Sequence, residues 1–301
     1  MFRRTRPAAG KFLIVNADDF GADIAVNEAS ERAFTDGILT SASLMVGGAA
    51  AQDAIERARR LKGLGVGLHV TLADGKPILS RRRIPGLVDK SGQFRDDLVR
   101  SGMRWFFNGT VRKQLANEID AQYQAFVKTG LVMDHVNAHK HLHIHPTAGK
   151  LIVGLGQGYG VPAIRIPMEP HKIIERVEPG RKAPRGPSLL LKSLRSRAAN
   201  YRMMTNDQVF GLAWSGAMTE QRLLALIPQL PDGITELYMH PATKDAEAMP
   251  HAAAGYRYRE ELEALLSPRV KEAIAAADIK LTRYSALKRP QAPAAALARR
   301  A

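Results

Sequence analysis

Two adjacent carboxylates, Asp18 and Asp19, end a short apolar run near the beginning of the chain. We expect this run, residues 12–15, to form a strand that is buried on both faces, as in a parallel sheet. Folds built on such sheets place ligands and chemistry at the carboxyl ends of their strands, so both side chains could reach one site. One aspartate could instead cap the helix that begins near Asp23, but a cap would employ only one carboxylate. The pair therefore points to chemistry at the end of this strand.

Five histidines are concentrated in one stretch of the chain, and all of them occupy odd-numbered positions. They are His135, His139, His141, His143 and His145. In an extended chain such residues share one face. Neutral imidazole is a common ligand of zinc and similar ions, and packing does not readily explain so many histidines together. We expect one or two of them to bind a metal directly.

Two further histidines are predicted to end strands at the same edge of the sheet. His69 lies in the predicted strand at residues 65–72, and His240 directly follows the predicted strand at residues 235–239. One carboxylate and two histidines from three strand ends would form a facial metal site with open positions for water and substrate. The second carboxylate would then be free to act as a base, and His240 could protonate a leaving group. His240 could equally be a loop histidine without a catalytic role.

An alternation of strands and helices is expected to position these residues. Strands are predicted at residues 12–15, 40–46, 65–72, 135–136, 163–166, 209–214 and 235–239 and near Ile279, and helices at 24–35, 111–128, 147–155 and 219–227. Residues 74–97 are rich in glycine, proline and charge, and we interpret them as a long active-site loop. The pattern favours a single-domain α/β fold, a variant (β/α) barrel of the TIM type with about seven strands.

The composition is that of one globular domain with basic ends. The chain has 301 residues, of which 45% are hydrophobic, enough for one large core. We assign residues 11–287 to the barrel, 1–10 to a basic N-terminal extension and 288–301 to a basic tail that we expect to be disordered. The absence of cysteine excludes disulfides and thiolate metal sites. No apolar run reaches the length of a membrane span and no secretory signal is recognisable, so we expect a cytoplasmic protein.

The net charge of +15 suggests contact with an anionic partner, either nucleic acid, a membrane surface or an acidic substrate. The alternative is that the charge, concentrated in arginine-rich ends, only aids solubility. Aromatic residues make up only 6% of the chain and no nucleic-acid motif is present, so we do not expect nucleic acid. Segment 179–202 is basic, has no acidic residue and contains four clustered leucines. We predict that it contacts the inner membrane peripherally through Arg181, Lys182, Arg195 and Arg197. The alternative is an ordinary helix whose leucines pack on the barrel.

Several motifs together resemble those of the YdjC-like carbohydrate deacetylases. They are Asn16–Gly21, Gly67–His69, the alternating histidines from His139 to His143 with Pro146, and His240–Pro241. The resemblance extends from Lys11 to Pro241. It implies a variant (β/α) barrel that removes the acetyl group from N-acetylated sugars with one divalent metal ion. That ion is Mg²⁺ by resemblance to the family, with Zn²⁺ or another transition metal as alternatives.

The resemblance also implies roles for individual residues. Asp19, His69 and His139 match the metal ligands, Asp18 matches the base and His240 matches the acid. Asn137 stands where some members of the family carry an aspartate. We assign substrate binding to His141, His143, Arg165 and Trp214.

Further stretches resemble the branch of this family associated with hopanoid biosynthesis. They are residues 136–141, 209–219, 255–258 and 266–270. That branch implies deacetylation of an N-acetylglucosaminyl group on a hopanoid lipid, giving the glucosaminyl form. The alternatives are deacetylation of soluble chito-oligosaccharides, metal-dependent hydrolysis of a phosphoester or glycoside, and a basic protein that binds membrane or nucleic acid. The expected partners are an N-acetylated sugar or glycolipid and a second copy of the chain in a homodimer.

Overall fold

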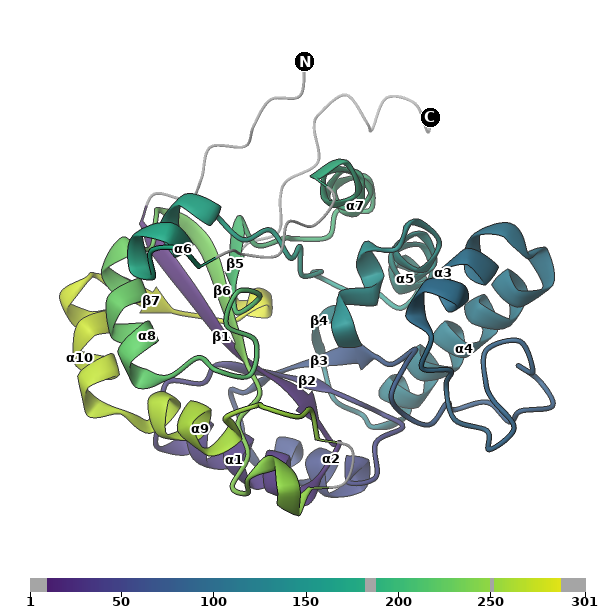
Figure 1. Ribbon diagram of the computed structural model, residues 1–301, viewed down its shortest axis with the longest axis horizontal. Coiled ribbons are helices and arrows are strands. Elements are labelled where there is room, and N and C mark those ends of the chain that lie inside the picture. Colours follow the sequence, from purple (N-terminus) through teal and green to yellow (C-terminus); the bar gives the residue numbers. More distant parts are fainter. Residues whose placement is uncertain (1–9, 182–187, 250–251, 288–301) are drawn as a thin grey trace.

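The fold is organised around β1 (Lys11–Phe20), a ten-residue strand in the middle of a curled parallel sheet. The computed structural model describes residues 10–181, 188–249 and 252–287. The other strands are β2 (Ser41–Leu44), β3 (Gly65–Val70), β4 (Met133–Ala138), β5 (Gln208–Phe210), β6 (Gly233–Met239) and β7 (Ile279–Leu281). Their order is β4-β3-β2-β1-β6-β5, with β7 paired to the first residues of β1, and every pairing is parallel. The prediction of a single-domain variant (β/α) barrel is confirmed (Figure 1).

Between β4 and β5 the ring continues through single bridges rather than a strand. The Val136 N–H donates to the Ala163 carbonyl and the Ile164 N–H donates to the Met204 carbonyl, each over 2.9 Å. Residues 163–166 were predicted as a strand, and the structure bears this out only as isolated parallel bridges at Ala163 and Ile164. Pro162 and Pro167 flank the segment, and neither has an N–H to donate to a ladder.

Strand β5 ends earlier than the predicted strand at residues 209–214. Gly211 has a positive φ of 131°, which turns the backbone out of the ladder. The N–H groups of residues 211–213 then donate to the carboxylate of Glu169 over 2.9–3.0 Å instead of to another strand. A buried side chain thus replaces the sheet as their acceptor.

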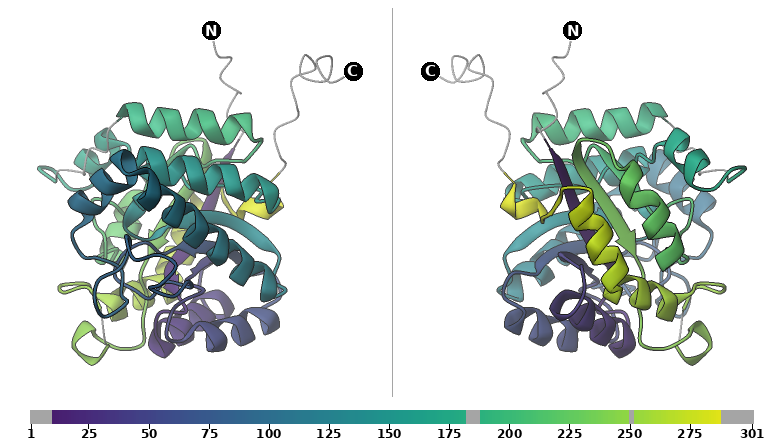
Figure 2. Two further views of the ribbon diagram at one scale, coloured as in Figure 1. Left: turned by 90° about the vertical axis from the view of Figure 1, so that its right-hand side faces the viewer. Right: turned by 90° about the vertical axis from the view of Figure 1, so that its left-hand side faces the viewer.

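The helices cover the outside of the sheet (Figures 1 and 2). They are α1 (Ile24–Thr35), α2 (Ala51–Arg60), α3 (Leu98–Phe107), α4 (Gly109–Lys128), α5 (Pro146–Gly158), α6 (His171–Val177), α7 (Ser188–Asn200), α8 (Glu220–Leu226), α9 (Tyr258–Leu266) and α10 (Pro268–Ala276). The predicted helix at 24–35 matches α1, whereas α3 and α6 were not predicted. Residues 74–97 contain no helix or strand, as predicted for a loop.

Side-chain caps divide the segment after this loop into two helices. Asp97 accepts a hydrogen bond from the Arg100 N–H at the start of α3, and Asn108 accepts one from the Val111 N–H at the start of α4. No helix of the described chain is long and apolar enough to cross a membrane. The predictions for residues 1–9 and 288–301 lie outside the described residues.

Candidate metal and catalytic site

The residues with candidate chemistry lie at one edge of the sheet. Asp18 and Asp19 are near the carboxyl end of β1, His69 is near the end of β3, and His139 and His240 directly follow β4 and β6. Because all strands run parallel, their carboxyl ends meet at the same edge. The fold therefore brings together residues that are up to 222 positions apart in the chain.

Three of these residues form a cluster of metal-ligand type. Asp19, His69 and His139 each offer one ligand atom, and these atoms lie within 4.8 Å of one another. The Asp19 Oδ1 atom is 3.2 Å from Nε2 of His69 and 2.9 Å from Nδ1 of His139. No other cluster of three such residues occurs in the described part of the chain. Two imidazoles and one carboxylate make a facial donor set that suits a transition metal, whereas Mg²⁺ prefers oxygen ligands.

The backbone at this cluster adopts conformations that non-glycine residues rarely use. Asp19, Lys140 and His141 have positive φ values of 63°, 51° and 53°. The two left-handed residues after His139 break the segment His139–Ile144 into short turns. Such strain persists where the surroundings hold the residue, and it is concentrated at functional sites. Here it points the Asp19 side chain at the two histidines.

Two orientations of the Asn137 carboxamide correspond to two tautomers of His69, and the reversed one satisfies more of its neighbours. With its oxygen 2.7 Å from Nδ1, the His69 ring donates from Nδ1 and its Nε2 lone pair faces Asp19. With the amide reversed, its nitrogen donates to Nδ1 over 2.7 Å and its oxygen accepts from Arg165. The first arrangement leaves Nε2 free to bind a metal. Asn137 thus lies where it can set the tautomer of a metal ligand.

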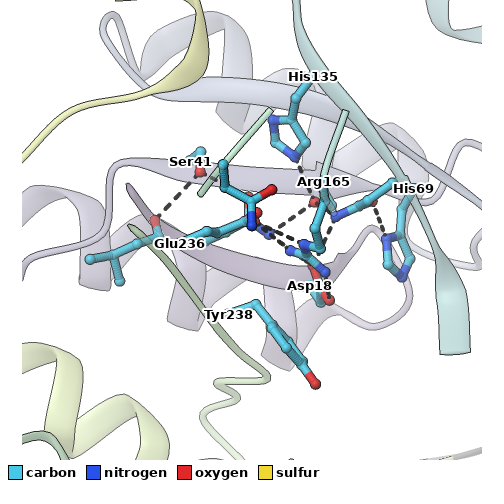
Figure 3. A network of polar contacts seen from close by, with 12 residues as sticks. Asp18, Ser41, His69, His135, Arg165, Glu236 and Tyr238 are labelled. Carbon is cyan, nitrogen blue, oxygen red and sulfur yellow. Dashed lines mark hydrogen bonds and ion pairs between the residues drawn. The ribbon is translucent and has the colours of Figure 1, made fainter. Parts of the chain in front are cut away.

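Asp18 forms an ion pair with Arg165 inside the barrel (Figure 3). Nη1 and Nη2 of Arg165 donate to its two carboxylate oxygens over 2.7 and 2.8 Å. The same guanidinium donates to Oε1 of Glu236 from Nε and Nη2, over 2.9 and 2.7 Å. Arg165 and Glu236 have no exposed surface and Asp18 only 3%. One buried cation therefore serves two buried carboxylates.

The ion pair determines the ionisation of Asp18. Burial alone would raise the pKa of the carboxyl, but the charge of Arg165, then that of His69, outweighs it and holds the pKa well below its usual range. Burial would likewise lower the pKa of Arg165, and the two carboxylates raise it instead. Asp18 is consequently a fixed carboxylate of low basicity beside the metal-ligand cluster.

Most of the chain is similar in sequence to a known protein family. Residues 12–276 match the family model described as YdjC-like protein. The chain belongs to the YdjC-like protein family. It is 30% identical to a protein of Geobacillus stearothermophilus named carbohydrate deacetylase, over 91% of this chain and 97% of the relative. It is 28% identical to a protein of the same name from Vibrio cholerae, over 91% and 96%.

Solved structures show the same fold. A putative cellobiose-phosphate cleavage protein from Enterococcus faecalis is 27% identical and has a TM-score of 0.71, with 92% of this chain and 99% of that chain covered. A lactam utilization protein from Thermus thermophilus is 14% identical with a TM-score of 0.50, covering 90% and 98%. The latter similarity concerns the fold alone.

In this YdjC-like protein the polar residues of the barrel interior follow a period of two. They are Asn16 and Asp18 in β1, Ser41 and Ser43 in β2, His135 and Asn137 in β4, and Glu236 and Tyr238 in β6, all of them buried. Alternate residues of a strand point to the same side, so these side chains all face inward. For most of these residues no role is predicted from the sequence. Polar residues at every second position of otherwise apolar strands were the signal that could have identified them.

One chain of hydrogen bonds in this interior has the residue types of a nucleophilic triad. Asp134 contacts Nδ1 of His135 over 2.9 Å, and Nε2 of His135 contacts the Ser43 hydroxyl over 3.0 Å. All three residues are buried, with at most 2% exposure. The Ser43 hydroxyl also accepts a hydrogen bond from Asn16, which donates to Asp18 over 2.8 Å. The chain therefore positions Asp18 rather than attacking a substrate.

Three other histidines of the histidine-rich stretch, His141, His143 and His145, lie outside the three-residue cluster. Nε2 of His141 is 3.1 Å from the Tyr238 hydroxyl. Both ring nitrogens of His143 are buried and have no hydrogen-bond partner among the described residues. Burial, then the charge of Arg165, lowers the pKa of His143 to about 3, so this ring is neutral. His145 instead caps α5, and its ring packs edge-on against Trp105 at 5.3 Å.

His240 begins the loop after β6, and a hydrogen bond from its backbone N–H holds it in place. Its N–H donates to the carboxylate of Glu261, a fully buried residue of α9. The imidazole lies 5.0 Å from the ring of Tyr256 and 5.7 Å from that of Tyr238. The Nδ1 atom is buried without a hydrogen-bond partner in the described chain. The residue as a whole is 9% exposed.

Two predicted substrate-binding residues occupy the interior in this structure. Arg165 contacts Asp18 and Glu236, as described above. Trp214 has no exposed surface, its indole N–H donates to Glu178 over 2.8 Å, and Arg222 stacks over its ring. In this conformation a substrate would not reach either side chain. A substrate-binding role for them stays a prediction.

The basic residues predicted to contact a membrane are partly engaged within the fold. Arg181 donates from Nε to the Ala213 carbonyl over 2.9 Å, and Arg195 donates to the carbonyls of Asn206 and Asp207 over 3.0 Å. Of the clustered leucines, Leu191 and Leu194 of α7 belong to the hydrophobic core. Arg197 is half-buried, and Lys182 lies outside the described residues.

Replacement of Arg165 by methionine should destabilise the protein by about 3–5 kcal/mol, because two carboxylates would remain buried without a cation. The loss should be larger at pH 8 than at pH 5. Without Arg165, burial raises the pKa of both carboxyls above their values in the unfolded chain, so folded-state protonation favours the fold at low pH and is lost as pH rises. Urea unfolding at both pH values measures this.

The matched control is Arg269→Met, which removes an exposed arginine that forms a 3.1 Å ion pair with Glu220. Exposed pairs contribute about 1 kcal/mol or less, so this variant should unfold almost like the parent at both pH values. If Arg165→Met were as stable as Arg269→Met, the buried ion pair would not be a constraint on the folded state.

Proposed function

We propose that this protein is a metal-dependent carbohydrate deacetylase that hydrolyses the N-acetyl group of an N-acetylglucosamine moiety. The observation that carries the proposal is the fixed Asp18 carboxylate next to the cluster of Asp19, His69 and His139. The relatives named carbohydrate deacetylases support the reaction class. The motif resemblance to the hopanoid-associated branch supports a hopanoid lipid as the carrier of the sugar. On this proposal the enzyme is cytoplasmic and meets its glycolipid at the inner membrane.

The three-residue cluster would hold one divalent ion. A cation bound there would polarise the acetyl carbonyl and lower the pKa of a water molecule. Asp19 supplies the anionic ligand, and Asn137 can hold His69 in the tautomer that leaves Nε2 free. Two imidazole ligands favour Zn²⁺ or another transition metal, whereas Mg²⁺ rests on the family resemblance.

Asp18 would accept the proton of the attacking water. Arg165 keeps this carboxylate ionised and fixes both of its oxygens, so it is ready to accept a proton without reorientation. The lowered pKa also makes it a weak base. Proton transfer to it therefore depends on a water that a cation in the neighbouring cluster would acidify.

His240 would donate a proton to the departing nitrogen. An amide nitrogen is a poor leaving group unless it is protonated, so the acid matters as much as the base. The bond from its backbone N–H to Glu261 fixes the position of His240, while its ring keeps a buried, unpartnered Nδ1. The acid and the base come from the ends of the neighbouring strands β6 and β1.

Single replacement of Asp19, His69 or His139 by alanine should abolish stoichiometric metal binding, since each removes one of three ligands. His143→Ala and His145→Ala should retain most of the metal, because neither residue belongs to the cluster. Elemental analysis of the purified variants checks this, with His145→Ala as the matched histidine control. Stoichiometric metal in His69→Ala protein would contradict the site.

Asp18→Asn should keep the metal and lose about 10²–10⁴-fold in kcat/KM, the usual cost of removing a general base. His240→Ala should lose a similar factor, since the leaving nitrogen is then unprotonated. Metal content and melting temperature, measured on the same samples, separate catalytic loss from unfolding. If Asp18→Asn lost the metal while Asp19→Asn kept it, the roles of the two carboxylates would be exchanged.

Acetate release from N-acetylglucosaminyl lipid and from soluble chito-oligosaccharides, in protein loaded with one metal at a time, tests the reaction and the substrate together. We expect acetate from the lipid at the higher kcat/KM. Acetate from the soluble sugar alone would remove the lipid substrate and keep the deacetylase. Release of free sugar or phosphate without acetate would refute the reaction class. Salt-dependent nucleic-acid binding without any hydrolysis would favour a binding protein.

A further inference from the structure

Helix α3 is apolar on two opposite sides. On the inner side Trp105 is buried and packs against His145. On the outer side four large apolar side chains face solvent: Val99 is 80% exposed, Met103 56%, Phe106 50% and Phe107 70%. Their spacing of four, three and one residues places them along one face of the helix. We call these four residues the α3 stripe.

The α3 stripe differs from other exposed apolar residues of the described chain. Those others, such as Val132 and Leu189, occur singly on different elements, which is normal for a protein surface. The stripe gathers four within nine positions at the outer edge of the molecule, beside α4 and α5 (Figures 1 and 2). A contiguous exposed apolar patch of this kind marks a surface that contacts a partner or a membrane.

Basic side chains surround the α3 stripe. A groove of about 780 Å³ between α3 and the start of α4 is lined by Met103 and Phe107 together with Arg100, Arg104 and Lys113. Across residues 95–113 the chain carries five basic residues and only two acidic ones, Asp96 and Asp97. Asp97 is already engaged as the cap of α3. The surface around the stripe is therefore cationic.

The positive charge around the α3 stripe indicates which partner covers it, a second copy of the chain or an anionic surface. Burial, then the like charges of Arg95 and Arg100, lowers the pKa of Arg104, so these cations already repel one another. A twofold dimer through this face would bring the same residues of both copies together and add to that repulsion. An anionic bilayer would relieve it and would also cover the stripe.

We propose that α3 docks the protein on anionic lipid bilayers, with the α3 stripe in the interfacial layer and Arg100, Arg104 and Lys113 against lipid phosphates. The inner side of α3 contacts His145, which follows His139 by six residues in the chain. The binding surface requires no assumption about the reaction. It differs from the segment 179–202 predicted from the sequence, where Arg181 and Arg195 bind carbonyl groups.

Co-sedimentation with vesicles of phosphatidylcholine, with and without phosphatidylglycerol, tests the docking surface on the full chain. We expect binding that requires phosphatidylglycerol and weakens with salt. Arg100→Gln/Arg104→Gln should weaken it about 30-fold, because each basic residue near an anionic leaflet contributes about 1 kcal/mol and 1.4 kcal/mol is tenfold. Met103→Ser/Phe107→Ser should weaken it about tenfold or more. All four residues are outside the metal and catalytic site.

The charge-matched control is Lys192→Gln/Arg197→Gln on α7, which should bind vesicles like the parent. A loss in this variant with none in the α3 variants would overturn the proposal in favour of α7. Unchanged binding in the α3 variants, or no binding of the parent to anionic vesicles, would also overturn it. So would conversion of a dimer to a monomer by Met103→Ser/Phe107→Ser, seen by light scattering, without a change in vesicle binding.

A second measurement detects docking as a gain of signal and does not rely on a variant that loses vesicle binding. The chain has no cysteine, so one introduced cysteine can carry an environment-sensitive fluorophore. At Phe107→Cys the emission should shift to the blue when anionic vesicles are added, because the probe enters an apolar layer. At Val132→Cys, an exposed position (85% before substitution, against 70% for Phe107), it should not shift. Equal responses at both positions would contradict docking through α3.

Discussion

The buried guanidinium of Arg165 is the interaction on which the site depends. A cation without exposed surface is tolerated only if anions and hydrogen bonds replace its hydration, and Asp18 and Glu236 provide both. This requirement joins three parts of the chain, since Asp18 is on β1, Glu236 is on β6 and Arg165 lies in the segment that closes the ring beyond β4. The irregular, proline-flanked segment is thus tied to the middle of the barrel by charge rather than by a regular ladder.

The two carboxylates at the end of β1 acquire different properties from this interaction. Asp18 points inward to Arg165 and keeps a fixed charge, whereas the left-handed backbone of Asp19 turns its side chain to His69 and His139. One strand end therefore provides both a proton acceptor and a metal ligand, adjacent in the chain but in separate environments. The polar interior, with Ser43, Asn16 and Asn137, connects the two through hydrogen bonds to Asp18 and His69.

The sequence predicted those site residues that stand at the end of an apolar strand. Asp19, His69 and His139 are conspicuous because polar residues follow apolar runs, and parallel strands must bring such ends together. The partnership of Arg165 with Asp18 spans 147 positions, and no local pattern predicts which buried carboxylate an arginine will meet. Segment 163–166 looked like a strand because its apolar residues fit one, yet the prolines on either side of it, Pro162 and Pro167, cannot donate to a ladder. Helix α3 was not predicted, although its apolar and basic residues segregate to different faces as in an amphipathic helix.

The ionisation state of Asp18 tests most directly whether the buried Arg165 keeps this carboxylate charged. Carbon-detected NMR on protein with ¹³C-labelled aspartate, assigned by comparison with Asp18→Asn, follows that carboxyl through an acid titration. We expect Asp18 to remain ionised at about pH 4, where an ordinary aspartate is half protonated, because Arg165 holds its pKa below the usual range. A titration midpoint at or above about pH 4 in the folded protein would contradict the role of the buried ion pair in keeping Asp18 charged.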